Sequence, residues 1–291
     1  MTFEGLLTQI LNGLTIGAIL MLIAMGLTLI FGLMGVVNFA HGALYMVGAY
    51  ICLEVVRFTD EFALAIVIAP LVVGVIGYFL ERSTIRPLYG GDPLKQVLLT
   101  FGVAVVLSEI VEMIWGPRIQ PLSPPEALAG SLAFLGIQYP VYRLSVLFVA
   151  VAVSGLIWFV LRQTNIGLII RSGTHDRDMV EALGINIRAT FAGVFVVGTM
   201  LAALAGVLIG PLRSVHPQMG AEVIVYAFIA VIVGGLGSVG GAAAGALLVG
   251  VAEVLGALII PGMAKAAIYV IVVIVLIFKP SGLFGGRPST S

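Results

Sequence analysis

The chain has 291 residues, of which 60% are hydrophobic and only 10% are charged, and its mean hydropathy is +1.19. Soluble domains carry about 25% charged residues, so this composition excludes a soluble globular protein and indicates an integral membrane protein. The net charge of zero argues against a nucleic-acid partner, and the single cysteine, Cys52, excludes a disulfide framework and a cysteine-based metal site.

Apolar runs predict about eight to nine membrane-spanning helices, because a membrane helix needs roughly 20 apolar residues. The seventh run is short and ends in glycine, so it and the eighth are candidates for a re-entrant pair of half-helices. The predicted fold class is therefore all-α, a polytopic transmembrane helical bundle that forms one domain over residues 1–291. The predicted spans are 6–30, 36–56, 62–80, 96–115, 141–161, 190–212, 222–234, 238–258 and 266–279.

The junction of the first two spans is interrupted by glycines and polar residues, in the run GLTLIFGLMGVVNFAHGALYMVGAY over residues 26–50. Unpaired backbone groups are costly in lipid, so such a break must be buried in protein or line a watered path. Asn38 and His41 are three positions apart and would share one helical face. Two readings stay open for them: they fix helix packing through hydrogen bonds, or they border a translocation route.

Five acidic residues lie within or at the ends of the predicted spans. Carboxylates inside a membrane are expensive and usually face the bundle interior or the interface. Glu253 lies deeper than the others, so it is the strongest candidate among them for a packing or pathway role. The five are Glu54, Glu109, Glu112, Glu222 and Glu253.

Small residues recur every four positions in two of the later spans. This spacing lets two helix backbones approach closely, so the favoured interpretation is helix packing. The first series is Gly198, Ala202, Gly206 and Gly210, and the second is Gly237, Gly241 and Gly245.

Residues 162–188 form a polar, basic interruption between two spans and carry four arginines. Within it, Thr174 is the predicted N-cap of a short helix over about 175–183, because Asp176 and Asp178 would then lie in its first turn. Gly184 is placed where such a helix would stop. A short polar helix between two spans favours a docking surface.

The distribution of Lys and Arg predicts the orientation of the chain. If 162–188 is cytoplasmic and every predicted segment crosses, the N-terminus is outside and the C-terminus is cytoplasmic. The cytoplasmic side then holds nine basic residues, and the opposite side five. The nine are Arg82, Arg86, Lys95, Arg162, Arg171, Arg177, Arg188, Lys279 and Arg287, and the five are Arg57, Arg118, Arg143, Arg213 and Lys265.

The sequence offers no credible catalytic or nucleotide-binding constellation. Its three histidines, His41, His175 and His216, fall in three different regions, and it has no glycine-lysine phosphate loop. We therefore expect a protein that is not an enzyme and that depends on a separate ATPase for any uphill transport. An independent channel or secondary transporter is the alternative, for which Asn38, His41 and Glu253 are the only candidate residues.

Two stretches resemble the LivH-type permeases, the membrane subunits of branched-chain amino acid ABC transporters. They are the run over 26–50 and the segment NIGLIIRSGTHDRDMVEALGINIRATFAGVFVVGTMLAALAGVLIGP over 165–211. The resemblance implies an importer permease in a bacterial inner membrane. It also implies a second permease subunit, identical or homologous, two ATP-binding subunits that hold the ATP, and a periplasmic substrate-binding protein.

The segment Glu181-Ala182-Leu183-Gly184 is similar to the coupling loop of ABC importers, which implies that the helix over 175–183 sits in a groove on the ATPase. Met179, Val180 and Leu183 would form the core of that contact, with charged residues at its rim. The family also serves urea and short amides, so the substrate stays open at this point. The implied coupling residues are Asp176, Arg177, Asp178, Met179, Val180, Glu181, Ala182, Leu183 and Gly184.

Overall fold

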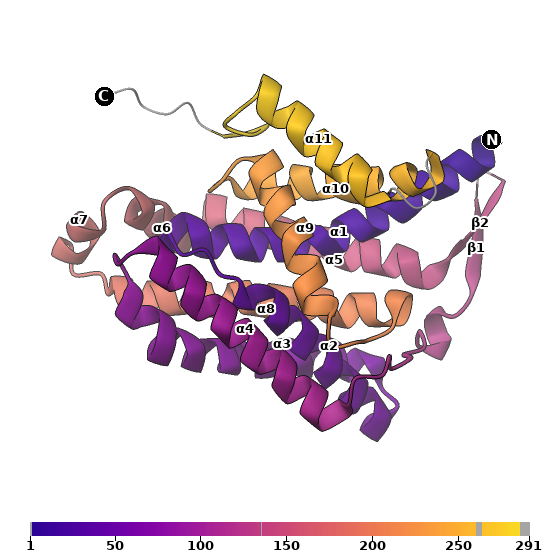
Figure 1. Cartoon of the computed structure of the whole chain (residues 1–291), viewed down its shortest axis with the longest axis horizontal. Coiled ribbons are helices and arrows are strands. Elements are labelled where there is room, and N and C mark those ends of the chain that lie inside the picture. Colours follow the sequence, from indigo (N-terminus) through magenta and orange to yellow (C-terminus); the bar gives the residue numbers. More distant parts are fainter. Residues whose placement is uncertain (1, 135, 260–263, 286–291) are drawn as a thin grey trace.

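The computed structural model describes residues 2–134, 136–259 and 264–285, which are mostly helical (Figure 1). One two-stranded antiparallel sheet pairs Ser131 with Pro140. The elements in chain order are α1 (Phe3–Met34), α2 (Ala40–Thr59), α3 (Phe62–Leu80), the π-helix η1 (Glu81–Ile85), the 3-10 helix η2 (Arg86–Leu88), α4 (Pro93–Trp115), the 3-10 helix η3 (Glu126–Leu128), β1 (Ser131–Phe134), β2 (Ile137–Pro140), α5 (Val141–Gln163), α6 (Asn165–His175), α7 (Arg177–Ala182), α8 (Ile187–Arg213), α9 (Met219–Gly234), α10 (Val239–Ile259) and α11 (Ala264–Phe278).

Each of the nine predicted spans corresponds to a helix, which confirms the polytopic helical bundle. Within the described residues, seven helices are long and apolar enough to cross a membrane, while α9 and α11 are shorter. The prediction of a short element holds for α9, which has 16 residues. It is wrong for α10, whose 21 residues suffice for a full crossing.

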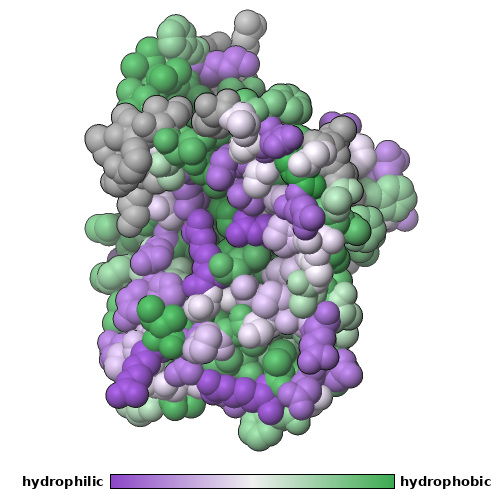
Figure 2. All heavy atoms as spheres, turned by 90° about the vertical axis from the view of Figure 1, so that its right-hand side faces the viewer, coloured by the Kyte–Doolittle hydropathy of each residue, from purple (hydrophilic) through white to green (hydrophobic). Residues whose placement is uncertain are grey.

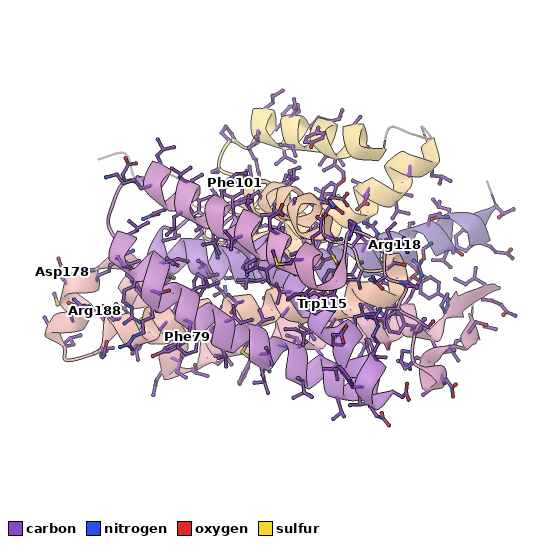
Figure 3. All side chains as sticks on the ribbon, turned by 60° about the horizontal axis from the view of Figure 1, so that its bottom comes forward. Phe79, Phe101, Trp115, Arg118, Asp178 and Arg188 are labelled. Carbon is purple, nitrogen blue, oxygen red and sulfur yellow. The ribbon has the colours of Figure 1, made fainter. Side chains whose placement is uncertain are left out.

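Helix α1 forms the centre of the bundle. It packs against α5, α8, α9 and α10, while α4 packs mainly on α2 at the edge (Figure 1). The outer helices expose large apolar side chains, among them Phe79 of α3 and Phe101 of α4, which point away from the bundle (Figure 3). Apolar residues this exposed belong against lipid tails, so α3 and α4 present a membrane-facing flank.

The two ends of the bundle carry different structures. At one end, here called the α7 end, α6 and α7 lie beside the end of α1; at the other, the hairpin end, β1 and β2 lie beside its beginning (Figure 1). Asp178 and Arg188 mark the α7 end in Figure 3, and Trp115 and Arg118 lie toward the hairpin end. Figure 2 looks onto the hairpin end and shows hydrophilic side chains spread over it. Polar groups thus gather at the two ends, where a bilayer would meet water.

After the exposed Gly35, the break between α1 and α2 runs into the protein interior. Gly35 takes a left-handed conformation with φ of 67°, and Val36 and Asn38 are fully buried in the segment that follows. Thr100 of α4 supplies hydrogen bonds there: its Oγ1 accepts from the Phe39 backbone N–H at 3.2 Å and donates to the Val37 carbonyl at 3.2 Å. These contacts satisfy backbone groups that lipid could not.

The small residues of α8 lie against α1 and α2. A Cβ added at Gly198 would lie 3.0 Å from the Gly26 carbonyl oxygen, and one at Gly206 would lie 2.0 Å from that of Tyr45. Ala202 is fully buried between them. At Gly210 a Cβ would lie 2.9 Å from a methyl carbon of Leu122 in the loop before η3.

In α10, Gly241 and Gly245 lie against α9, where an added Cβ would meet the carbonyl oxygens of Gly234 and Ala230 at 2.2 Å. Gly237 differs. It lies in the turn before α10 with φ of 80°, and an added Cβ would meet nothing within 4 Å. The packing role predicted for Gly237 is therefore wrong; its glycine is explained by a turn conformation that other residues rarely adopt.

Replacing Gly206 with alanine is expected to lower the free energy of unfolding by about 1–3 kcal/mol, because the methyl group would force α8 away from α2. Gly102 provides a matched control within α4, since a Cβ there would meet nothing within 4 Å. Thermal unfolding in detergent should separate the two variants. Equal melting temperatures for Gly206→Ala and Gly102→Ala would contradict the close approach of α8 to α2.

Candidate functional site

Two short helices, α6 and α7, form the polar stretch at the α7 end. Helix α6 was not predicted, although its apolar residues recur at helical spacing. Thr164 caps it, accepting a hydrogen bond from the Gly167 backbone N–H at 3.3 Å. Ile166 and Leu168 are more than half exposed, so α6 leaves apolar side chains uncovered by the rest of the chain. A short amphipathic helix of this kind suits the membrane interface.

Helix α7 is shorter than predicted, and Asp176, not Thr174, is its N-cap. The Asp176 carboxylate accepts from the Met179 backbone N–H at 2.9 Å, whereas the Thr174 hydroxyl donates within α6 to the Arg171 carbonyl at 2.6 Å. A carboxylate is favoured at this position because it also faces the positive end of the helix dipole. Gly184 follows with φ of 81° and stops the helix, as the sequence predicted.

Helix α7 is fastened to the bundle on one side by Arg177 and Val180. The Arg177 guanidinium donates to the Leu33 carbonyl at 3.1 Å and lies 4.8 Å from the ring centroid of Phe191. Val180 is only 3% exposed. The interpretation of Val180 as part of a docking core is therefore wrong, because this side chain is already buried within its own chain.

The other side of α7 is open. Met179 is 59% and Leu183 is 72% exposed, and both are apolar. Around them Asp176, Asp178 and Glu181 are exposed, as are Ala182 and Gly184. The helix therefore exposes two apolar side chains together with three acidic ones, while Arg177 and Val180 attach its opposite side to the bundle.

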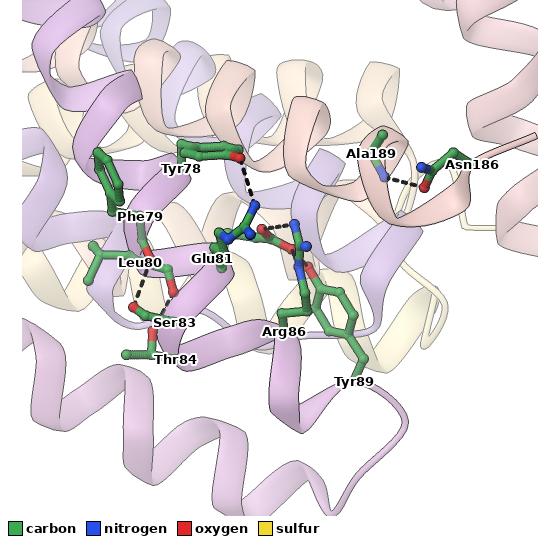
Figure 4. Close-up of polar contacts among 11 residues, drawn as sticks. Tyr78, Phe79, Leu80, Glu81, Ser83, Thr84, Arg86, Tyr89, Asn186 and Ala189 are labelled. Atoms are coloured by element: carbon green, nitrogen blue, oxygen red, sulfur yellow. Dashed lines mark hydrogen bonds and ion pairs between the residues drawn. The ribbon is translucent and has the colours of Figure 1, made fainter.

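A buried carboxylate, which the sequence analysis did not single out, lies at the corner between α3 and α4 (Figure 4). Glu81, in the π-helix η1, is fully buried and receives hydrogen bonds from Arg86 Nε at 3.0 Å and Nη2 at 2.7 Å. The Tyr89 hydroxyl donates to the same carboxylate at 2.5 Å. Burial, together with this hydrogen bond, raises the pKa of Tyr89 above its usual range, so its proton stays in place.

Phe191 of α8 connects this corner to α7. Its ring stacks edge-on against Tyr89, with centroids 5.3 Å apart, and its face receives the guanidinium of Arg177. A displacement of α7 would therefore press on the α3–α4 corner, the start of α8 and the end of α1. These three places belong to different spans, so a movement of α7 can be transmitted to several spans of the bundle at once.

Asn38 and His41 are fully buried at the break before α2. His41 Nε2 lies 3.1 Å from the Ile23 carbonyl oxygen, while His41 Nδ1 and both amide atoms of Asn38 have no hydrogen-bond partner among the described residues. Buried polar atoms without partners are costly.

Glu253 lies elsewhere, on α10, and pairs with Arg213 at the end of α8 at 2.8 Å. The two side chains are 19% and 49% exposed, respectively. The structure thus pairs Glu253 with Arg213, which the sequence analysis had counted only among the loop residues. It does not bring Glu253 to Asn38 or His41.

Comparison with known proteins covers almost the whole chain. Residues 9–278 match the family described as branched-chain amino acid transport system / permease component. The high-affinity branched-chain amino acid transport system permease protein BraD of Pseudomonas aeruginosa is 34% identical over 97% of this chain and 96% of its own length. LivH of Escherichia coli, of the same description, is 29% identical over 98% and 97%. The ribose import permease protein RbsC of Haemophilus influenzae is 26% identical over 80% and 70%.

Proposed function

The chain belongs to the family of branched-chain amino acid transport permeases, and from this premise we propose its place in an assembled importer. It is the membrane-spanning permease subunit of an ABC importer for branched-chain amino acids, a multi-pass protein of the inner membrane. In our proposal it pairs with a second permease, identical or homologous. A periplasmic binding protein delivers the substrate, and two separate ATPase subunits bind the ATP.

The observation that carries the coupling role is the two-sided build of α7. Arg177 and Val180 hold it to the bundle, while Met179 and Leu183 stay exposed to a partner. Apolar residues at the centre and charges at the rim match the anatomy of a protein–protein interface. We propose that the ATPase accepts this helix in a groove and that its nucleotide-driven closure moves the spans through Phe191.

The orientation proposed for the chain places the α7 end in the cytoplasm. Three arginines, Arg82, Arg86 and Arg188, line one groove of about 470 Å³ there, and two more, Arg162 and Arg171, line a second cavity. Cytoplasmic ends of membrane proteins carry an excess of basic residues. The hairpin end then faces the periplasm, where the binding protein docks.

The unpartnered atoms of Asn38 and His41 and the Arg213–Glu253 pair support a pathway role for these residues. Polar groups at these two separate places suit a zwitterion, whose ammonium and carboxylate groups both need partners when they leave water. The charged pair on α8 and α10 is expensive against lipid, which favours its facing the second permease or the watered route between the two.

Reconstitution of the chain with a second permease, two ATPase subunits and a binding protein from the same organism should test the function. We expect ATP-dependent accumulation of leucine, isoleucine and valine in vesicles. Urea, a short amide and ribose complete the panel, because a relative is named for ribose import. Preferred uptake of urea or the amide would show that the proposed substrate is wrong, while the role of the chain as a permease subunit would stand. Accumulation by the purified chain alone would instead indicate a secondary transporter.

A further inference from the structure

Two cavities adjoin one another at the α7 end, and the transport function proposed above assigns no ligand to either. The first, of about 580 Å³, lies between α1, α5, α6 and the start of α10. The second, of about 460 Å³, lies between α5, α6 and α8. Three residues, Leu29, Leu161 and Ile170, line both, so the two cavities share a wall.

The first cavity has the chemistry of an anion site. Arg162 and Arg171 line it together with Ser238 and the first residues of α10. Ser238 caps α10, accepting from the Gly241 backbone N–H at 3.0 Å, so the positive end of this 21-residue helix faces the cavity.

An independent observation also indicates a ligand in the first cavity. Thr28 of α1 is 1% exposed and lines this cavity, and its hydroxyl has no hydrogen-bond partner among the described residues. A buried hydroxyl without a partner is costly, and an anionic oxygen in the cavity would accept a hydrogen bond from it.

The second cavity has the chemistry of a hydrocarbon site. Its lining is almost wholly apolar and includes Ile157, Val160, Ile169 and Val197, with Thr190 as the polar exception. Beside the first cavity, the Arg162 guanidinium lies 5.3 Å from the ring centroid of Trp158, which is 46% exposed. Trp and Arg at the end of a span are typical of the level of lipid headgroups.

We propose that these adjoining cavities bind one anionic phospholipid. Its phosphate lies in the first cavity against Arg162, Arg171, the Thr28 hydroxyl and the start of α10, and an acyl chain lies in the second. Leu29, Leu161 and Ile170 line both cavities, so the phosphate site and the apolar site lie side by side, as the two parts of one phospholipid require. A free anion would fill only the basic part and would leave the apolar groove, which opens between membrane-spanning helices, without an occupant.

The lipid would brace α6 against α1 and α5, directly before α7. Gly167 keeps α6 close to the end of α5, where an added Cβ would meet the Leu161 carbonyl oxygen. The position of α7 then depends on a helix that is held from one side by lipid. This proposal rests on the membrane placement of the chain and not on its ATPase partners.

Native mass spectrometry of the purified chain, released from nanodiscs of phosphatidylglycerol and phosphatidylethanolamine, tests the proposal. We expect retained phosphatidylglycerol, reduced about tenfold or more in the double variant Arg162→Gln/Arg171→Gln, because each basic contact contributes to anionic-lipid affinity. Val197 lines the apolar groove and is 37% exposed, so Val197→Trp should fill the groove and also release the lipid. Excess inorganic phosphate should not displace it.

Matched controls keep these outcomes distinct. Arg118→Gln removes a basic residue toward the hairpin end, and Gly102→Phe fills a different apolar groove, so both should keep the lipid at wild-type level. Unchanged lipid in both cavity variants would overturn the proposal, as would equal retention of phosphatidylethanolamine. Displacement by phosphate would indicate a free-anion site. A Trp158→Cys cross-link to another subunit of the assembled complex would show that protein, not lipid, covers the cavities.

Discussion

Met179→Asp is expected to weaken association of the chain with its ATPase subunits by about 30-fold or more, the effect of losing a central interface anchor. Met179 is 59% exposed on the open side of α7, so the change puts a charge where an apolar contact is proposed without disturbing the bundle. Asp176, Asp178 and Glu181 lie on the same short helix, so the new carboxylate would add to their mutual repulsion and would lose its water when the groove covers it. Co-purification and substrate-stimulated ATP hydrolysis would measure the loss.

Met179→Leu is the matched control, since it keeps an apolar side chain of similar volume and should retain assembly. Leu183→Asp should behave like Met179→Asp, because Leu183 is exposed on the same helix. Thermal unfolding of the isolated chain should be unchanged in all three variants. Full assembly and full ATP hydrolysis with both aspartate variants would remove the docking role from α7 while leaving the family assignment intact.

The bundle was predictable because the dominant cost in a membrane is an unsatisfied backbone, and helices alone solve it locally. The nine apolar runs therefore became nine helices. The break at Gly35 and the stop at Gly184 were also visible, since both need a positive φ that glycine adopts freely. These features depend on a residue and its immediate neighbours, so one sequence is enough to find them.

The parts that sequence reasoning missed depend on contacts between distant segments. Val180 and Met179 are equally apolar neighbours, and only the position of α7 on the bundle buries one and exposes the other. Gly237 kept the spacing of a packing series, yet it falls in the turn before α10. Thr174 does not cap α7 because it belongs to α6, so Asp176 is the N-cap instead. The amphipathic pattern of α6 was the signal that the sequence analysis did not use.

The burial of Glu81 could not be predicted from the sequence either, and it affects the stability of the fold more strongly. In the sequence it is one acidic residue at the end of a span, and its partners Arg86 and Tyr89 look like interfacial residues. A π-helix at η1 turns the carboxylate inward, where a regular helix end would have left it in water. The clue available was spacing alone, an acid followed by a base five positions later, and that spacing is too common to predict burial.

Removing this carboxylate is expected to lower the free energy of unfolding by about 3 kcal/mol, because Glu81→Ala leaves the Arg86 charge and the Tyr89 hydroxyl without their buried partner. Glu81 is fully buried but Arg86 is 28% exposed, so the expected loss of unfolding free energy lies at the lower end of the range for buried ion pairs. Thermal unfolding would measure the stability. We also expect weaker coupling of ATP hydrolysis to transport, since Tyr89 would no longer hold Phe191 beside Arg177.

Two further variants decide whether the effect comes from the buried charge. Arg82→Gln lies one residue away and loses one exposed hydrogen bond to Tyr78, 3.2 Å long, so it should change stability by less than about 0.5 kcal/mol. The double variant Glu81→Leu/Arg86→Met removes both charges and should cost less than Glu81→Ala, because no buried charge is stranded. If Glu81→Ala proved as mild as Arg82→Gln, the corner would be an incidental ion pair. α7 would then act on the bundle only through the contacts of Arg177 with Leu33 of α1 and Phe191 of α8.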